Sequence, residues 1–187
     1  MALVIVDVSS YEAFKNATLG NGYDVTSPYG YQCTELPKEL TGSAGRTSPY
    51  WMSGTGNAYE AWSDATSRAY NKGDMFTLVY TKGEVRKGDI VVLDKGRFTG
   101  DTTGHVAFAD SDWNANTTSA VLLGQNQVDP NPTTGHVTTL TNMSVTKFLG
   151  AFRFRAWQQP TPTNQKKKKR YPWAVFGNEI RNRALGQ

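Results

Sequence analysis

One cysteine and two histidines limit the covalent chemistry that this chain of 187 residues can perform. Because Cys33 is the only thiol, neither an intrachain disulfide nor a zinc site of several thiolates can form. A cysteine attacks a carbonyl group as its thiolate, and imidazole is the usual base beside it. Cys33 is therefore either a buried apolar residue or a nucleophile that works with His105 or His136.

The two histidines lie in different sequence surroundings. The segment Gly104-His105-Val106-Ala107-Phe108 places His105 at the start of an apolar strand, after a glycine-containing turn. A side chain at such a point projects from a rigid scaffold. His136 instead follows the polar run DPNPTTG, which is typical of a loop. We therefore expect His105 to be the base and His136 to be an exposed turn residue.

The residues that follow Cys33 predict a helix. Residues 20–32 are dense in Gly, Asn, Ser and Pro and are typical of a loop, whereas residues 32–40 carry Leu36 and Leu40 one helical step apart. Cys33 is thus predicted at or near a helix N-terminus. The partial positive charge there lowers the pKa of a thiol, so we expect a lowered pKa for Cys33.

Two further helices are predicted in the first half of the chain. Ser9 and Glu12 form a capping-box pattern that indicates a short helix over residues 10–18, ending before Gly20. A second amphipathic helix is indicated across residues 57–71 by four apolar side chains at helical spacing, Ala58, Trp62, Ala65 and Ala69. We expect Trp62 to lie in the core.

Beyond Gly73 the pattern changes to short apolar or alternating runs separated by polar turns. These runs are FTLVY (76–80), DIVVLD (89–94), HVAFAD (105–110), SAVLLG (119–124) and FLGAFRFRAW (148–157). They predict the strands of a mainly antiparallel sheet. Because the helices come first, the fold class is α+β, with the N-terminal helices packed against one side or end of the sheet.

The chain is long enough for one domain, which we place at residues 1–157. Residues 158–170 (QQPTPTNQKKKKR) are typical of a basic linker, and residues 171–187 of a docking tail. After Asn164 the chain has seven Lys and Arg residues and one acidic residue, Glu179, so this end carries a net charge of +6. Since the whole chain carries +4, the residues before it carry −2. Such a tail binds anionic surfaces, including wall polymers, or is a solvated basic run.

Composition excludes some classes of protein. The opening run ALVIVDV is too short to cross a bilayer and lacks a basic leader, so we expect neither a membrane span nor a signal peptide. The domain shows no alternation of aromatic and basic residues and no nucleic-acid-binding motif. Nucleic acid is therefore not an expected partner.

The segments around the candidate residues resemble the CHAP family, the cysteine, histidine-dependent amidohydrolases and peptidases of the papain-like superfamily. The matching segments, in the order of the family, are Tyr29-Gly30-Tyr31-Gln32-Cys33 with Glu35-Leu36, Gly56-Asn57-Ala58 with Trp62, Lys87-Gly88-Asp89-Ile90-Val91, Gly104-His105-Val106-Ala107, Gln125-Asn126, and Phe148-Leu149-Gly150 with Phe152-Arg153. The resemblance spans roughly residues 10–157 and implies a papain-like CHAP fold.

The resemblance also implies roles for individual residues. Cys33 attacks the carbonyl carbon, His105 transfers the proton, and Asn126 matches the polar residue that orients the imidazole. Many relatives carry Glu two residues before this Asn, where the present chain has Gly124, so Asn126 is left to orient His105. Gln32 resembles the residue that stabilises the oxyanion, and helix capping or packing is its alternative role.

Some relatives bind calcium in the loop before the cysteine, through alternating oxygen ligands. Asp24 and Glu35 match acidic positions of that pattern, while Thr26, Pro28 and Gly30 stand where stronger ligands are expected. Calcium prefers six to eight oxygen ligands. We expect an absent or weak calcium site and no other cofactor.

Three aromatic residues are candidates for the walls of a substrate groove. Trp51 and Trp113 lie in polar loops, and Tyr31 lies two residues before Cys33. Exposed aromatic rings in loops are suited to packing against sugar and peptide groups.

The resemblance implies a peptidoglycan amidase or endopeptidase of the kind found in phage lysis enzymes and phage tail enzymes. Such an enzyme acts on the bacterial cell wall after release from the host cytoplasm, or as part of a virion, and the basic tail is then a contact for wall polymers or for tail proteins. The alternative is a non-catalytic wall-binding or virion structural module with the same fold. Gly124 is the feature that favours this alternative.

Overall fold

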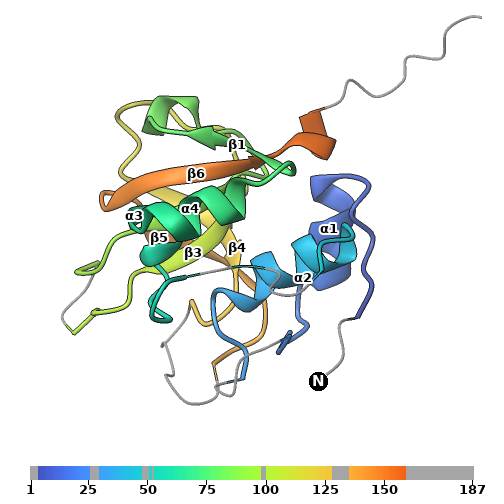
Figure 1. Cartoon of the computed structure of the whole chain (residues 1–187). Coiled ribbons are helices and arrows are strands. Elements are labelled where there is room, and N and C mark those ends of the chain that lie inside the picture. The colour runs from blue at the N-terminus through green and yellow to red at the C-terminus, as the bar shows by residue number, and fades with distance from the viewer. Residues whose placement is uncertain are drawn as a thin grey trace, which may run out of the picture.

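In the part of the chain that the structure describes, six antiparallel strands form one sheet, and four short helices precede it (Figure 1). The computed structural model describes residues 4–25, 30–47, 51, 53–97, 100–127 and 135–158. The helices are α1 (Tyr11–Thr18), α2 (Glu35–Ser43), α3 (Glu60–Ser63) and α4 (Ala65–Lys72). The strands are β1 (Phe76–Val79), β2 (Ile90–Leu93), β3 (His105–Ala109), β4 (Ser119–Gly124), β5 (Thr139–Ser144) and β6 (Phe148–Phe154), with 3₁₀ turns at Lys82–Glu84 and Arg155–Gln158.

The strands are hydrogen-bonded in the order β1-β6-β2-β3-β4-β5, which places β3 inside the sheet. Because side chains alternate across a strand, the sheet carries apolar residues on both faces. Val106 and Phe108 of β3 belong to the core under the helices, whereas Ala107 and Ala109 belong to a second cluster that contains Trp113. The predicted α+β class with a mainly antiparallel sheet is confirmed.

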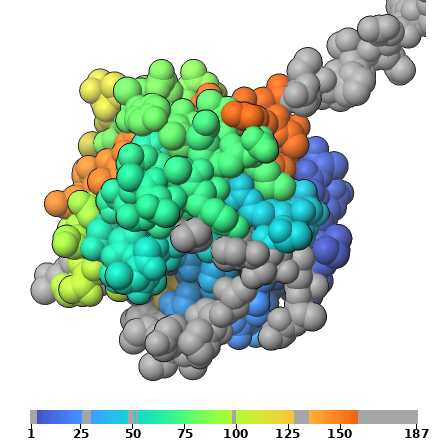
Figure 2. Space-filling view, in the orientation of Figure 1, coloured from blue at the N-terminus to red at the C-terminus, as the bar shows by residue number. Residues whose placement is uncertain are grey.

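The helices cover one face and one side of the sheet. Figure 1 shows α3 and α4 in front of β6, with α1 and α2 beside them, and Figure 2 shows that residues of these helices make much of the surface seen from this side. Phe14 of α1, Leu36 of α2 and Trp62 of α3 share one core cluster. Trp62 packs directly on Gly150 of β6, where a Cβ atom would lie 2.1 Å from the indole ring. The expected core position of Trp62 is confirmed.

Two details of the predicted helices are wrong. The cap of α1 is Ser10 rather than Ser9, since Ser10 Oγ accepts from the N–H of Ala13 at 3.1 Å. The single helix predicted over residues 57–71 is divided at Asp64, whose backbone is extended. Asp64 ends α3 and caps α4 by accepting from the N–H of Ser67 at 2.6 Å. A side chain that binds its own backbone in this way competes with a continuous helix.

The sheet contains one strand that the apolar pattern does not predict. β5 pairs with β4 at the end of the strand order, and its residues are alternately half-buried and exposed. The run TLTNMS therefore lacks the apolar face that identifies a strand in sequence.

The last described residues close the core beside α1. Residues 155–158 form a 3₁₀ turn instead of continuing the strand, and Trp157 packs against Phe14 and Phe108. Its Nε1 donates to the carbonyl of Val8 at 2.9 Å. Apart from Gln158, the predicted linker (158–170) and tail (171–187) lie outside the described residues. Among the residues that are described, no helix has the length and apolar character needed to cross a membrane.

Candidate active site

Cys33 lies in the turn that leads into α2, one residue before the helix cap Thr34. Leu36 and Leu40 are fully buried and hold this helix against the core. Cys33 packs against the core cluster that contains Val106 of β3, and the backbone N–H of Val106 acts to lower the pKa of the thiol. The predicted position at a helix N-terminus is confirmed, and the helix delivers the thiol to the strand that carries His105.

His105 is the first residue of β3, as predicted, and it pairs with Leu93 of β2. The residue before it must be glycine. Gly104 has φ +69°, and a Cβ atom there would lie 2.5 Å from the carbonyl oxygen of Leu93 and 2.8 Å from the Cβ of Tyr59. This close approach fixes the point at which His105 enters the sheet, where its side chain is only 2% exposed.

The partner of His105 is Gln127, which the sequence did not indicate. The Nε2 atom of His105 lies 3.4 Å from Oε1 of Gln127. The amide nitrogen of Gln127 donates to the carbonyls of Leu122 (3.0 Å) and Thr139 (2.9 Å), which belong to β4 and β5. The missing carboxylate at Gly124 could have signalled that another group must fix the ring of His105, but it does not single out Gln127.

Asn126 contacts other residues than expected. Its Nδ2 donates to Oε1 of Gln32 at 2.8 Å, and its Oδ1 lies 3.3 Å from Nδ1 of His136. Within the part of the chain that the structure describes, no hydrogen bond joins Asn126 to His105. The expected role of Asn126 in orienting His105 is thus not supported by a direct contact, since the side chain of Asn126 contacts Gln32 and His136 instead.

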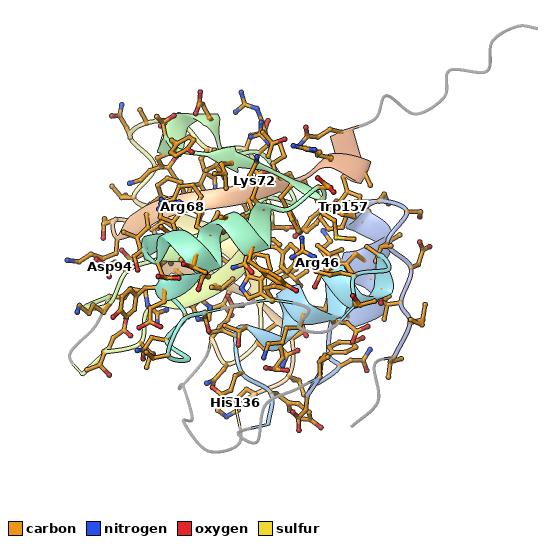
Figure 3. All side chains as sticks on the ribbon, viewed as in Figure 1. Arg46, Arg68, Lys72, Asp94, His136 and Trp157 are labelled. Carbon is orange, nitrogen blue, oxygen red and sulfur yellow. The ribbon has the colours of Figure 1, made fainter. Side chains whose placement is uncertain are left out.

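His136 is half-buried, so its prediction as an exposed turn residue is wrong. Its carbonyl accepts from the N–H of Asn126 at 3.1 Å, in addition to the side-chain contact. Figure 3 places His136 in the loop region below α2, far from the labelled Trp157. His136 thus supports Asn126 instead of standing in solvent.

Burial determines the charge of the two central residues. It lowers the pKa of His105 to about 3, helped by the positive charge of Arg97 and opposed by the contact with Gln127. Burial also raises the pKa of Cys33, although the N–H of Val106 and the Arg97 charge act the other way. The pKa of the thiol is thus raised and not lowered as expected, because desolvation outweighs the N–H of Val106 and the charge of Arg97.

The thiol and the imidazole are therefore both neutral at pH 7, and no hydrogen bond joins their side chains in the described part of the chain. They share a backbone neighbour in Val106 and the field of Arg97. A pair of this kind begins as thiol and neutral imidazole, and the proton moves during attack rather than before it.

Comparison with known protein families places this site in a recognised group. The model of the CHAP domain matches residues 21–126, which is more than half of the chain and includes Cys33, His105 and Asn126. The chain belongs to the CHAP domain family. The resemblance drawn from the sequence is confirmed. A comparison with curated proteins gave no match.

One solved structure shows the same fold as this CHAP domain, and a second superposes less closely. The endolysin LysIME-EF1 superposes with a TM-score of 0.55 at 20% identity, over 76% of this chain and 62% of that chain. An N-acetylmuramoyl-L-alanine amidase from Staphylococcus aureus gives a TM-score of 0.41 at 18% identity, over 72% of this chain and 34% of that one. The chain thus spans less than two thirds of either structure.

A buried ion pair holds the loop that precedes His105 in the CHAP domain. Arg97 Nε lies 2.7 Å from Oδ2 of Asp101, and both side chains are almost fully buried. Arg97 also donates to the carbonyl of Gly104 (3.1 Å), while Asp101 Oδ1 accepts from the N–H of Gly104 (3.0 Å). Both backbone polar groups of the glycine before His105 are therefore held by the same pair.

Two of the three groove candidates are core residues. Trp51 is 4% exposed and packs edge-on against Phe76 and Phe152, and Trp113 is 5% exposed and packs against Phe148. Their prediction as groove walls is wrong, since large aromatic rings in polar loops fold inward when an apolar cluster lies beneath them. Tyr31 remains half-buried, with its ring against Gly22.

The acidic residue at the predicted calcium position already has a cationic partner. Glu35 is fully buried, its Oε2 accepts from the N–H of Val25 at 2.8 Å, and its Oε1 pairs with the ammonium of Lys38 at 2.5 Å. No group of three or more metal-ligating side chains occurs among the described residues, and Thr26 and Pro28 lie outside them. The expectation of an absent or weak calcium site stays a prediction.

Proposed function

We propose that the CHAP domain is a peptidoglycan hydrolase that cleaves an amide or peptide bond of the bacterial cell wall, with Cys33 as nucleophile and His105 as general base. The observation that carries this proposal is the position of Cys33 beside the start of β3, where it packs against the core cluster that contains Val106, the residue that follows His105. Membership of the CHAP family and the fold shared with a protein named as an endolysin support it.

The proposed acylation begins with neutral partners. Sγ of Cys33 bonds to the substrate carbonyl carbon, and its proton passes to the imidazole of His105 while the carbonyl oxygen becomes an oxyanion. The C–N bond then breaks, and the leaving amine takes the proton from His105. The products are the amine and a thioester on Cys33. Water attacks the thioester with His105 again as base, which releases the acid and returns the proton to Cys33.

Gln32 and the backbone N–H of Cys33 are the proposed donors to the oxyanion. Because Oε1 of Gln32 accepts from Asn126, the amide nitrogen is the end of Gln32 that can donate to substrate. Asn126 thus acts on the oxyanion through Gln32. A purely structural role for Gln32 predicts the same contact but no effect on catalysis.

Alkylation tests the thiol mechanism sharply because Cys33 is the only cysteine. Iodoacetamide is added until mass spectrometry shows one adduct, and clearing of a Gram-positive wall suspension is followed in parallel. We expect activity to fall with the fraction alkylated and Cys33→Ala to be inactive while still pelleting with walls. Undiminished clearing by the alkylated protein or by Cys33→Ala would overturn the mechanism. A native protein that pellets with walls but clears none of several wall types would establish the binding module instead.

We further propose that the protein is encoded by a phage, as an endolysin or a virion-associated lysin. The basic segment at residues 165–187 supports a contact with anionic wall polymers or with tail proteins. Deletion of this segment should weaken wall pelleting at low salt, or incorporation into particles, without changing the bond that is cut. Mass spectrometry of released fragments identifies that bond, because an amidase leaves free lactyl groups and an endopeptidase leaves new peptide amines.

A further inference from the structure

Gly124 and Gln127 share one space beside His105. A Cβ atom added to Gly124 would lie 3.0 Å from both Cδ and Oε1 of Gln127, and 3.0 Å from the Cβ of Ala107. A longer side chain at position 124 would therefore collide with the Gln127 amide. The backbone at Gly124 lies in an ordinary strand, so crowding by the Gln127 amide and the Cβ of Ala107, and not backbone conformation, disfavours a side chain here.

The direction of the Gln127 amide is fixed by its own hydrogen bonds. Its nitrogen faces two carbonyl oxygens, those of Leu122 and Thr139, and a flipped amide would point its oxygen at both. Oε1 must therefore face Nε2 of His105. Since an amide oxygen only accepts, Nε2 carries the hydrogen and Nδ1 of the neutral ring is left without one.

The chain around Gln127 is anchored so that this contact is held in place. Gln125 accepts from the N–H of Tyr23 at 3.1 Å and donates to its carbonyl at 2.9 Å, which ties the end of β4 to the loop before Cys33. The left-handed residue Asn126 then turns the chain, and Gln127 returns over Gly124 with only 6% of its surface exposed. Such a side chain has little freedom to move when substrate binds.

We infer that Gln127 is the positioning residue of this site: it replaces the carboxylate that relatives place at position 124 and holds His105 in the tautomer whose Nδ1 takes the proton of Cys33. The inference rests on the proposed role of His105 as base. An amide fixes the ring as a carboxylate does but carries no charge, so it stabilises the imidazolium less. A neutral imidazole is then kept as base even in mildly acidic surroundings.

The direct test is long-range ¹H–¹⁵N NMR of the imidazole nitrogens in the full chain. With two histidines, the signals of His105 are identified by comparison with His136→Asn. In the native protein we expect the Nε2–H tautomer at His105. In Gln127→Ala we expect a mixture of tautomers, with kcat on walls lowered roughly 10²-fold and KM little changed. Folded Gln127→Ala with an unchanged tautomer and an unchanged kcat would overturn the inference.

A nearly isosteric variant covers the case in which Gln127→Ala does not fold. Gln127→Glu keeps the oxygen that faces His105 and adds a negative charge, so the pKa of His105 measured by NMR should rise and the acidic limb of the activity profile should shift with it. The double variant Gly124→Glu with Gln127→Ala should restore the native tautomer. An unchanged titration of His105 in folded Gln127→Glu would contradict a contact with Gln127.

Gln125→Ala is the matched control, because it removes a buried amide from the same turn that binds Tyr23 rather than His105. It should lower stability, whereas the His105 tautomer should stay native because Gln127 keeps its own hydrogen bonds to the carbonyls of Leu122 and Thr139. The NMR readouts do not require wall cleavage. A native protein that shows the tautomer but clears no walls would thus refute the proposed function and leave the role of Gln127 standing.

Discussion

The Nδ2 atom of Asn126 donates to Oε1 of Gln32 at 2.8 Å, and this contact joins the turn after β4 to the residue before Cys33. Residues 94 positions apart in the chain are thereby held in one polar network. In the proposed mechanism, the Asn of the CHAP pattern thus lies on the side of the site where charge develops on the substrate oxygen.

Asn126→Ala therefore tests the network without removing a residue that touches His105. Loss of one hydrogen bond is worth about 1 kcal/mol, so kcat should fall roughly five- to tenfold while the His105 tautomer stays native. Gln32→Ala should lower kcat roughly 10²-fold. The double variant of Gln32→Ala and Asn126→Ala should lower kcat no further than Gln32→Ala alone. Additive losses measured on walls would show that the two residues act separately.

The two histidines should differ sharply in their effect on activity. His105→Ala removes the proposed base and should lower kcat by at least roughly 10²-fold. His136→Ala loses one contact with Asn126 and should lower kcat by less than about tenfold. Initial rates of wall clearing, with folding checked by circular dichroism, measure both. A greater loss in His136→Ala would reverse the assignment of the base.

Stability should fall as the solution is acidified through the range of His105. The pKa of this residue is about 3 in the folded protein and 6.5 in the unfolded chain, so only the unfolded chain takes up the proton between these values. The contribution of neutral His105 to the free energy of unfolding is therefore complete above pH 6.5 and is lost as the pH falls toward 3. At about 1.4 kcal/mol per pKa unit, it amounts to a few kcal/mol. Urea unfolding at several pH values measures it. In His105→Gln this part of the pH dependence should disappear, and a slope equal to that of the native protein would contradict the burial of a neutral ring.

Gly104→Ala should destabilise the protein far more than an alanine at another left-handed glycine. Gly104 has both positive φ and no room for a Cβ, whereas Gly20 (φ +79°) has nothing within 4 Å of that position. Gly20→Ala should cost about 1 kcal/mol and Gly104→Ala more than about 3 kcal/mol. Thermal unfolding of both variants provides the comparison, and equal losses would mean that only backbone conformation matters at Gly104.

Calcium removal should leave activity unchanged, because Lys38 already neutralises Glu35. Clearing rates in EDTA and in millimolar calcium should agree within error. Lys38→Met removes the internal cation, so Glu35 is left buried without its ammonium partner and the protein should lose stability. A native protein inactivated by EDTA and rescued by calcium would show a metal site elsewhere in the chain.

The sequence predicted the parts of the structure that depend on local pattern. Residue spacing was enough for α2 and for β3, because burial of one face determines the positions of Leu36 and of Val106 and Phe108. It failed for β5, whose residues are only half-buried or exposed at the edge of the sheet, so that the strand has no buried apolar face. Trp51 and Trp113 were misplaced because burial in a loop depends on the cluster beneath it, which sequence spacing does not reveal.

The residue types of the candidate site could be predicted from the sequence, but the contacts between its side chains could not. Cys33 and His105 follow from residue chemistry and family resemblance, since a thiol and an imidazole have few other uses together. The partner of His105 depends on a turn at one left-handed residue, Asn126, which exchanges the directions of neighbouring side chains. Until that turn is known, no local sequence pattern shows whether Gln127 or Asn126 contacts His105.

The shared volume of Gly124 and Gln127 makes these two positions dependent on each other in evolution. A chain that acquires glutamate at 124 while keeping glutamine at 127 overfills the space, and one that loses the glutamine first leaves the imidazole unsupported. Exchange between the two arrangements therefore passes through an impaired intermediate, or requires both codons to change together. Lineages of this domain should accordingly divide into two groups, with few sequences that combine a large residue at both positions.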